Sequence, residues 1–209
     1  MRTVIALYFL SCTIPCAAIQ NPRDFDRQLS RIAEDFKEVI MDEDECEELK
    51  DKAEYISKEI EELLEESEGF SSEEILQLEQ LKTEAEGIED FIAVVAGVGS
   101  AVPKVKDFIR ANERMGVGLY YISQEEYCVD ILVVEIDEYV TYLASNNSNK
   151  SFRLNFEWKT KDKSSFGSSK VGMSSKTIRS MLNNRDYTLK NNIDFKNIEC
   201  IEFKKWGEN

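Results

Sequence analysis

The chain has 209 residues and a formal net charge of −15, and it contains no histidine. The missing histidine excludes Ser-His-Asp and Cys-His nucleophile systems, histidine zinc sites and histidine pH switches in their usual forms. The charge is uneven, because residues 19–149 hold 12 basic and 34 acidic residues (net −22), whereas residues 150–209 hold 13 and 7 (net +6). This asymmetry argues against nucleic acid as a partner of the acidic part.

The N-terminus has the pattern of a secretory signal peptide. Arg2 precedes an apolar run from Val4 to Leu10, and small residues follow up to Ala18. We predict that residues 1–18 are removed and that the product is secreted or held in the lumen of the secretory pathway. A retained membrane anchor is the weaker interpretation, because no stop-transfer pattern follows and no later apolar run reaches the roughly 20 residues of a membrane span. A location outside the cell or in the secretory pathway also argues against nucleic acid as a partner of the basic part.

Three cysteines remain once the signal peptide is removed, namely Cys46, Cys128 and Cys200. An oxidising compartment permits one disulfide, and the odd count leaves a third thiol that is buried, reactive or bonded to a second chain. The spacing does not choose the pair.

A first helix of about 20 residues is expected from Pro22 onward. Its apolar positions recur every three or four residues; they are Phe25, Leu29, Ile32, Phe36 and Val39. The phase breaks across residues 41–45, which predicts either a kink or two separate helices, with Asp42 or Asp44 as the next N-cap. The six carboxylates of residues 42–48 lack the glycine and terminal glutamate of an EF-hand loop. We interpret them as a solvated helix start rather than a calcium site.

Two further helical patterns predict an antiparallel hairpin of the coiled-coil type. The first apolar track is Cys46, Leu49, Ala53, Ile56, Ile60 and Leu63, and the second is Leu78, Leu81, Ala85, Ile88, Ile92, Val95 and Val102. Gly69 suits the left-handed residue that closes a helix, and Ser71 with Glu74 forms a capping box at the next helix start. The short loop between the patterns favours side-by-side packing of the two helices.

Residues 91–102 carry no charge and are apolar on every helical face. The first interpretation is a core segment packed by its neighbours, in which Gly97 and Gly99 provide close packing or a bend. The second is a membrane-inserting segment that leaves the core on contact with lipid. Its inserting side chains would be Phe91, Ile92, Val94, Val95, Val98 and Val102.

The predicted helices end near residue 116. Pro103 is expected in the first turn of a last helix that carries Val105, Phe108, Ile109 and Met115 and stops at Gly116 and Gly118. Residues 119–122 favour a strand. Residues 127–143 combine a strand-like composition with helical spacing, and we favour a strand for residues 128–136.

The basic part contains the clearest strand pattern. Phe152, Leu154, Phe156 and Trp158 alternate with polar residues. We expect a loop over residues 161–175, a short helix over 177–182 and further strands over 187–189 and 198–203, giving an antiparallel sheet of three or four strands. Asn146 and Asn149 begin two glycosylation sequons in a polar stretch, which suits an exposed loop of a secreted protein.

Residues 163–185 contain five basic residues and no acidic one: Lys163, Lys170, Lys176, Arg179 and Arg185. Such a surface is suited to anionic lipids or sulfated glycans. It is equally suited to docking on the acidic helices of its own chain or of a second copy. Aromatic residues beside lysines, such as Trp158 and Trp206, are either contacts to glycans or lipid headgroups or ordinary strand residues facing a core.

The sequence therefore predicts an α+β protein, with an acidic helical region over residues 19–116 and a β-rich region over 117–209 that is basic from residue 150. No nucleotide-binding glycine motif or metal-ligand spacing is present, so we expect no cofactor. The preferred function is a secreted, non-enzymatic binding protein that engages a protein, glycan or anionic lipid surface. A membrane-active effector is the second hypothesis and a carboxylate-based hydrolase the third. Self-association through helix faces or a third cysteine stays open.

Overall fold

The computed structural model describes residues 21–66, 69–122, 128–137, 139–160, 165–182 and 193–203, so the predicted signal peptide lies outside the described residues. The helices are α1 (Pro22–Val39), α2 (Glu43–Glu65), α3 (Ser72–Ala96) and α4 (Val105–Met115). The strands are β1 (Gly118–Ile122), β2 (Asp130–Ile136), β3 (Tyr139–Ser145), β4 (Phe152–Thr160), β5 (Phe166–Met173), β6 (Ile178–Ser180) and β7 (Ile193–Glu202). Helices followed by antiparallel strands confirm the α+β prediction.

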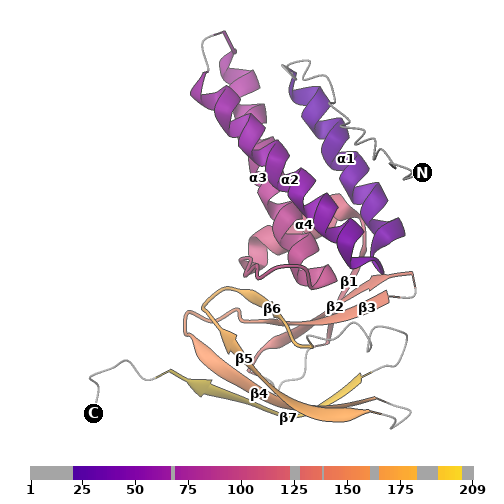
Figure 1. Ribbon diagram of the computed structural model, residues 1–209. Coiled ribbons are helices and arrows are strands. Elements are labelled where there is room, and N and C mark those ends of the chain that lie inside the picture. Colours follow the sequence, from indigo (N-terminus) through magenta and orange to yellow (C-terminus); the bar gives the residue numbers. More distant parts are fainter. Residues whose placement is uncertain are drawn as a thin grey trace, which may run out of the picture.

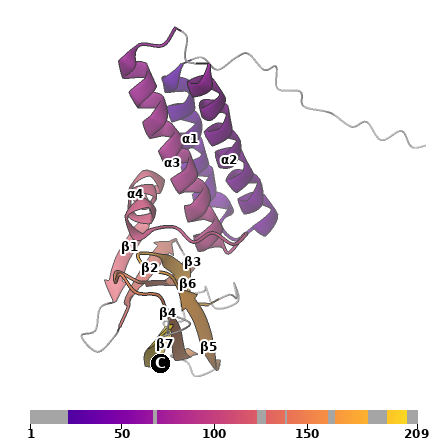
Figure 2. The ribbon, with the colours of Figure 1, turned by 90° about the vertical axis from the view of Figure 1, so that its left-hand side faces the viewer.

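The molecule consists of a bundle of helices that stands on one of two stacked sheets (Figure 1 and Figure 2). One antiparallel sheet has the order β1-β2-β3-β6 and the other β5-β4-β7. Helix α4 and the near ends of the long helices lie against one face of the first sheet, and the second sheet covers its other face. One hydrophobic cluster accordingly joins the helices to Leu132 and Val134 of β2, and a second joins Ile131 and Val133 to the second sheet. The first cluster crosses the predicted boundary at residues 116–117, where helices give way to strands.

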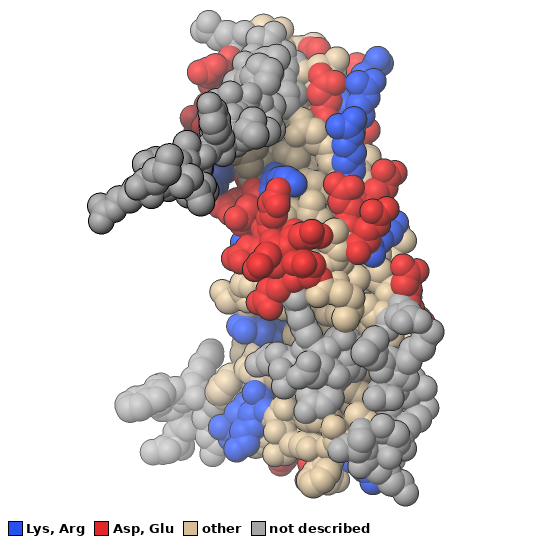
Figure 3. Space-filling model, turned by 45° about the vertical axis from the view of Figure 1, so that its right-hand side comes forward, with Lys and Arg blue, Asp and Glu red and all other residues tan. Residues whose placement is uncertain are grey.

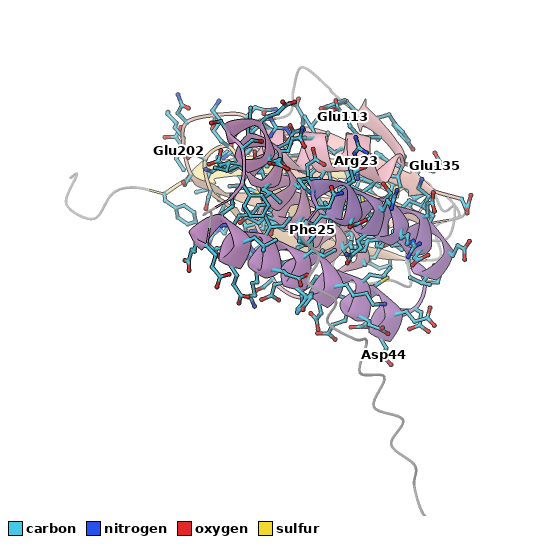
Figure 4. The ribbon with its side chains drawn as sticks, turned by 90° about the horizontal axis from the view of Figure 1, so that it is seen from above. Arg23, Phe25, Asp44, Glu113, Glu135 and Glu202 are labelled. Atoms are coloured by element: carbon cyan, nitrogen blue, oxygen red, sulfur yellow. A yellow bond between two sulfur atoms is a disulfide. The ribbon has the colours of Figure 1, made fainter. Side chains whose placement is uncertain are left out.

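The break in helical phase separates α1 from α2. Pro22 occupies the first turn of α1, where its missing N–H is not needed. The backbone N–H of Glu45 donates to the Asp42 carboxylate (3.1 Å), which makes Asp42 the N-cap of α2. In the view from above, Phe25 points into the helical layer while Asp44 and Glu202 lie at the margins (Figure 4). Of the alternatives that the sequence left open, the structure therefore has two separate helices and Asp42 as the cap.

Helices α2 and α3 form the predicted antiparallel hairpin (Figure 2). The capping box of Ser71 and Glu74 is present, with the Ser71 N–H donating to the Glu74 carboxylate at 2.8 Å. Lys82 of α3 pairs with Glu61 of α2 at 2.7 Å. Gly69 has a φ of 122° but is not the helix-closing residue, because α2 ends at Glu65 with Glu66 as its C-cap.

The first half of the apolar segment of residues 91–102 belongs to the core, as first interpreted, whereas Gly97, Gly99 and Ser100 are exposed. All six residues from Phe91 to Ala96 are buried in the last turns of α3, and Val98 is buried behind them. Gly97 (φ 72°) ends the helix and Gly99 (φ 85°) bends the chain away. Nothing lies within 4 Å of a Cβ built at either glycine, so the bend and not close packing explains them. None of the helices described is long and apolar enough to cross a membrane.

Helix α4 begins at Val105, after Pro103, and not with Pro103 in its first turn as predicted. Lys104 is its N-cap, so Pro103 precedes the helix instead of lying in the first turn. The carbonyl of Pro103 accepts from the Ile178 N–H of β6 (3.0 Å), which shows why the chain is still extended there. Gly116 ends α4 in the left-handed conformation as predicted, whereas Gly118 already belongs to β1.

Burial on both faces resolves the ambiguity of residues 127–143. Strands β2 and β3 pair antiparallel from Asp130–Ser145 to Ile136–Tyr139. A strand covered on both sides needs apolar residues at every position, so the period-two signal is lost and helical spacing arises by chance. The strand prediction for residues 128–136 is confirmed from Asp130 onward.

Two predictions in the basic part were wrong. Phe166–Met173, expected to be a loop, forms edge strand β5, whose alternating small and exposed residues give it little apolar signal. Ile178–Ser180, expected to be helical, pairs with β3 as β6. Strand β4 follows its predicted alternation, and β7 covers residues 198–202 of the last predicted strand. The sheet of the basic part therefore has three described strands; residues 187–189 lie outside the described ranges.

A disulfide between Cys128, just before β2, and Cys200 in β7 links the two sheets covalently (Cα–Cα 6.1 Å). The third thiol, Cys46, is buried in the helical core, and its Sγ donates to the carbonyl of Val39 at 3.3 Å. An intermolecular disulfide through Cys46 is incompatible with that burial. The structure thus selects the pair that spacing left open.

Candidate functional site

A cavity of about 600 Å³ lies where the helical layer meets the two sheets. We call it the junction cavity. Its volume falls within the range of sites that hold small ligands or short segments. Its lining comes from the end of α3 and the following bend, from β3, β5 and β6, and from the start of α2. The lining residues are Glu43, Ala93–Gly97, Gly99–Ala101, Tyr139–Tyr142, Lys170–Gly172, Arg179, Ser180 and Leu182.

One wall is the C-terminal end of α3. This end is held to the first sheet by the Tyr139 hydroxyl, which donates to the buried carbonyl of Val95 at 2.5 Å. A helix C-terminus carries partial negative charge from its last carbonyl groups. Glu43, at the start of α2, adds a carboxylate to the same margin of the cavity. This side of the cavity therefore favours hydrogen-bond donors and cations.

Two basic residues also line the cavity, Arg179 on β6 and the exposed Lys170 on β5. Neither side chain takes part in an ion pair among the residues that the structure describes. The Nε atom of Arg179 is buried and has no hydrogen-bond partner there. A buried donor without a partner costs about 1–3 kcal/mol, so an anionic or acceptor group beside Arg179 would be stabilised.

Another wall is an exposed strand edge. Strand β6 pairs only with Leu143–Ser145 of β3. The Met181 N–H donates to the Tyr142 carbonyl at 3.0 Å, which shows that the backbone groups of Tyr142 point away from β2. Because these directions alternate along a strand, the N–H and C=O of Val140 point the same way, into the cavity margin. No described strand covers them.

The five predicted anionic-surface residues are only partly brought together. Lys170 and Arg179 meet at the junction cavity, while Lys163 and Arg185 lie outside the described residues. Lys176 has a structural role instead. Its ammonium group contacts the carbonyl of Asn147, and its own carbonyl accepts from the Val105 N–H at 3.0 Å. Acidic side chains gather over the helices on the face shown in Figure 3, as the charge asymmetry predicts.

Carboxyl groups with a raised pKa lie elsewhere. Burial is the main cause of the raised pKa of Glu59 on α2 and of Glu89 and Asp90 on α3. None of the three lines the junction cavity or the two other hollows, which lie beside α3–α4 and beside β4–β5. No group of three or more Cys, Asp or Glu residues within the described ranges is placed to hold a metal ion.

The two sequons differ in their surroundings. Asn146 is fully buried, and its Nδ2 donates to the carbonyls of Lys150 (2.8 Å) and Ser174 (2.7 Å). A glycan needs this nitrogen, so the observed loop is incompatible with glycosylation at Asn146. Asn149 is exposed to solvent. The prediction of a glycan therefore rests on Asn149 alone.

Trp158 belongs to the core between the sheets, which favours its interpretation as an ordinary strand residue over a contact to glycans or lipid headgroups. Its side chain is buried, and the backbone of Gly167 lies against its ring, where a Cβ would approach within 2.9 Å. Trp206 lies outside the described residues. The candidate inserting residues from Phe91 to Val98 are also buried, and Val102 is half-buried.

The junction cavity was not predicted as a site, although its apolar segment and two of its cations were. Glu43 and the edge of β3 carry no local signal in the sequence, because only the packing of α3 on the first sheet brings them together. No family model, curated protein or solved structure matches this chain. The assignment of function therefore depends on the geometry of the cavity.

Proposed function

We propose that this protein is a secreted, non-enzymatic binding protein that holds an anionic group in the junction cavity. The observation that supports it is the presence of Lys170 and Arg179 in the lining, two cations without an ion-pair partner among the described residues; the Nε of Arg179 is also buried without a hydrogen-bond partner there. Charge-assisted hydrogen bonds from such groups are worth about 1.5–3 kcal/mol each. The disulfide between Cys128 and Cys200 is compatible with an oxidising compartment.

A hydrolase is less well supported. Glycoside cleavage by carboxylates needs two of them facing each other across one cleft. Within the described chain, Glu43 is the one carboxylate that lines the junction cavity. The carboxyl groups with a raised pKa, those of Glu59, Glu89 and Asp90, do not line this cavity.

A membrane-active function is the second candidate, because residues 91–102 remain the longest uncharged run of the described chain. Insertion would have to expose Phe91, Ile92 and Val95, each at most 1% exposed in the core. Leaving a side chain of this size in water costs about 1.5–3 kcal/mol. The sum over the segment approaches the whole stability of a typical domain, so we place binding first.

The first experiment measures binding of the amphipathic sulfonate 8-anilinonaphthalene-1-sulfonate to the mature chain by fluorescence. We expect Lys170→Gln with Arg179→Gln to weaken binding at least about tenfold, the effect of losing one charge-assisted hydrogen bond. The control is Lys159→Gln with Lys196→Gln, which removes the same charge beside a different hollow. Equal binding by both double variants would refute the proposed site. Thermal unfolding of each variant verifies that the fold is retained.

A vesicle experiment separates the second candidate. The mature chain is mixed with dye-filled vesicles of neutral or anionic lipid. A binding protein leaves the dye inside, and Val95→Asp changes nothing beyond stability. Dye release that is abolished by this substitution would favour the membrane-active function instead.

A further inference from the structure

The edge of β3 indicates which kind of ligand the junction cavity takes. At a sheet edge, exposed N–H and C=O groups are a template for another strand. Here Val140 presents both groups toward the cavity, while β6 has already left β3 at Tyr142. An apolar ligand would leave these backbone groups without partners, at a cost of about 1–3 kcal/mol for each buried group. An extended peptide would satisfy both of them.

The charges at the cavity complement such a peptide only in part. Arg179 of β6 and the exposed Lys170 of β5 line the cavity and attract a carboxylate. The C-terminal end of α3 also lines the cavity, and its last carbonyl groups repel one. A peptide with one acidic side chain toward β5 and β6 therefore fits better than a uniformly acidic one.

The free edge of β3 at the cavity is short. Val140 and Thr141, with the adjoining residues of β3, offer an edge of roughly 10 Å at a rise of about 3.3 Å per residue. The lining is mixed, because apolar side chains such as Val94, Tyr142 and Leu182 lie beside charged residues and the strand edge. A short extended segment carries both apolar side chains and polar backbone groups, so it suits this lining better than a lipid tail does.

We infer that the junction cavity binds an extended peptide segment of a partner protein, which adds as a strand to the edge of β3 and places an acidic side chain against Lys170 and Arg179. This inference depends on the proposed function, since it names the ligand of the same cavity. In this binding mode, main-chain hydrogen bonds supply affinity and side-chain contacts supply specificity. Here the specificity contact is the ion pair with the two cations.

The test uses an array of seven-residue peptides that alternate polar and apolar residues around a central glutamate. The best binder is measured on the full mature chain by fluorescence anisotropy. Two matched peptides are then compared with it. One has glutamine in place of the glutamate, and the other carries N-methyl groups on alternate backbone amides, which removes strand hydrogen bonds but keeps the charge. We expect each change to weaken binding at least about tenfold.

A substitution in the protein tests the same edge. Val140→Pro removes the N–H that faces the cavity without removing a hydrogen bond to β2. The control is Tyr121→Pro in β1, at the opposite edge of the same sheet, where alternation also directs the N–H away from β2. We expect Val140→Pro to weaken peptide binding at least about tenfold and Tyr121→Pro to leave it unchanged. If Val140→Pro does not fold, the N-methylated peptide still decides the question.

Two outcomes would overturn the inference: no peptide binds, or the glutamate, glutamine and N-methylated peptides bind alike. If the sulfonate still binds through Lys170 and Arg179, the proposed function survives and the ligand is a small anion. If neither the sulfonate nor a peptide depends on these residues, both proposals fail together.

Discussion

Removal of the disulfide is expected to destabilise the protein more than any single surface change. Cys128 and Cys200 are separated by 72 positions in the sequence, so their bond closes a long loop in the unfolded chain. The loop-entropy relation assigns about 4 kcal/mol to a loop of this length at 25 °C. This is a large share of the 5–15 kcal/mol that stabilises a typical domain.

The disulfide stabilises the contact between the two sheets. The disulfide connects the chain just before β2, at the centre of the first sheet, to β7 of the second sheet. Without it, the two sheets are joined by hydrophobic contacts and chain connections. The helical layer keeps its own contacts to β2 and β3, so we expect the second sheet to loosen first.

The assay is urea unfolding of the Cys128→Ser/Cys200→Ser variant, followed by circular dichroism. With a slope of about 2 kcal/mol per molar urea, a loss of 4 kcal/mol lowers the midpoint by about 2 M. The matched control is reduction of the unsubstituted protein, which should give the same shift. A change of less than about 1 kcal/mol in both would refute the assignment of this pair as the stabilising bridge.

Three further predictions concern single side chains. Asn149→Gln is expected to remove any N-linked glycan from the secreted protein, which would appear as a decrease in mass. Asn146→Gln should leave the glycan in place and lower the free energy of unfolding by about 1–3 kcal/mol, because two carbonyl groups lose their hydrogen-bond donor. A glycan lost only with Asn146 would contradict this. Tyr139→Phe removes the donor to the buried Val95 carbonyl and should cost about 1–3 kcal/mol in urea unfolding; no measurable loss would show that this contact does not hold α3 on the sheet. Burial first, and then nearby carboxylates, raises the pKa of Asp90, so its ionised form destabilises the fold above that pKa. Asp90→Asn should therefore stabilise the protein at pH 7, and this advantage should disappear as pH falls below the unfolded-state pKa of about 4; the same advantage at pH 7 and pH 3.5 would exclude the ionisation as its cause.

The helical part was predictable because its signals are local. The apolar track beginning at Phe25, the Asp42 cap and the capping box at Ser71 each depend on residues within one or two turns of helix. The structure changed only details, such as the start of α4 after Pro103. Strand β4 was predictable for the same reason, since one face is buried and its side chains alternate.

The prediction failed where a strand is defined by its neighbours. In strand β5, Ser and Gly make up half of the residues, and the strand is held by pairing with β4. Strand β6 has three residues and is held by β3 and by the residues before α4. Strand β2 was predicted from its composition, but burial on both faces removed the alternation that would have marked it clearly. These elements depend on contacts far apart in the sequence, which a local pattern does not contain.

Local sequence patterns predicted the α+β order, the existence of the four helices and the separation of acidic and basic parts, and they favoured burial of residues 91–102. Packing of the helices and both sheets was needed to pair Cys128 with Cys200, to enclose Asn146 and to bring Lys170 and Arg179 near the edge of β3 and the end of α3. The first group follows from interactions within a few residues along the chain. The second requires segments that are far apart in the sequence to come together, which happens only when the helices and both sheets pack.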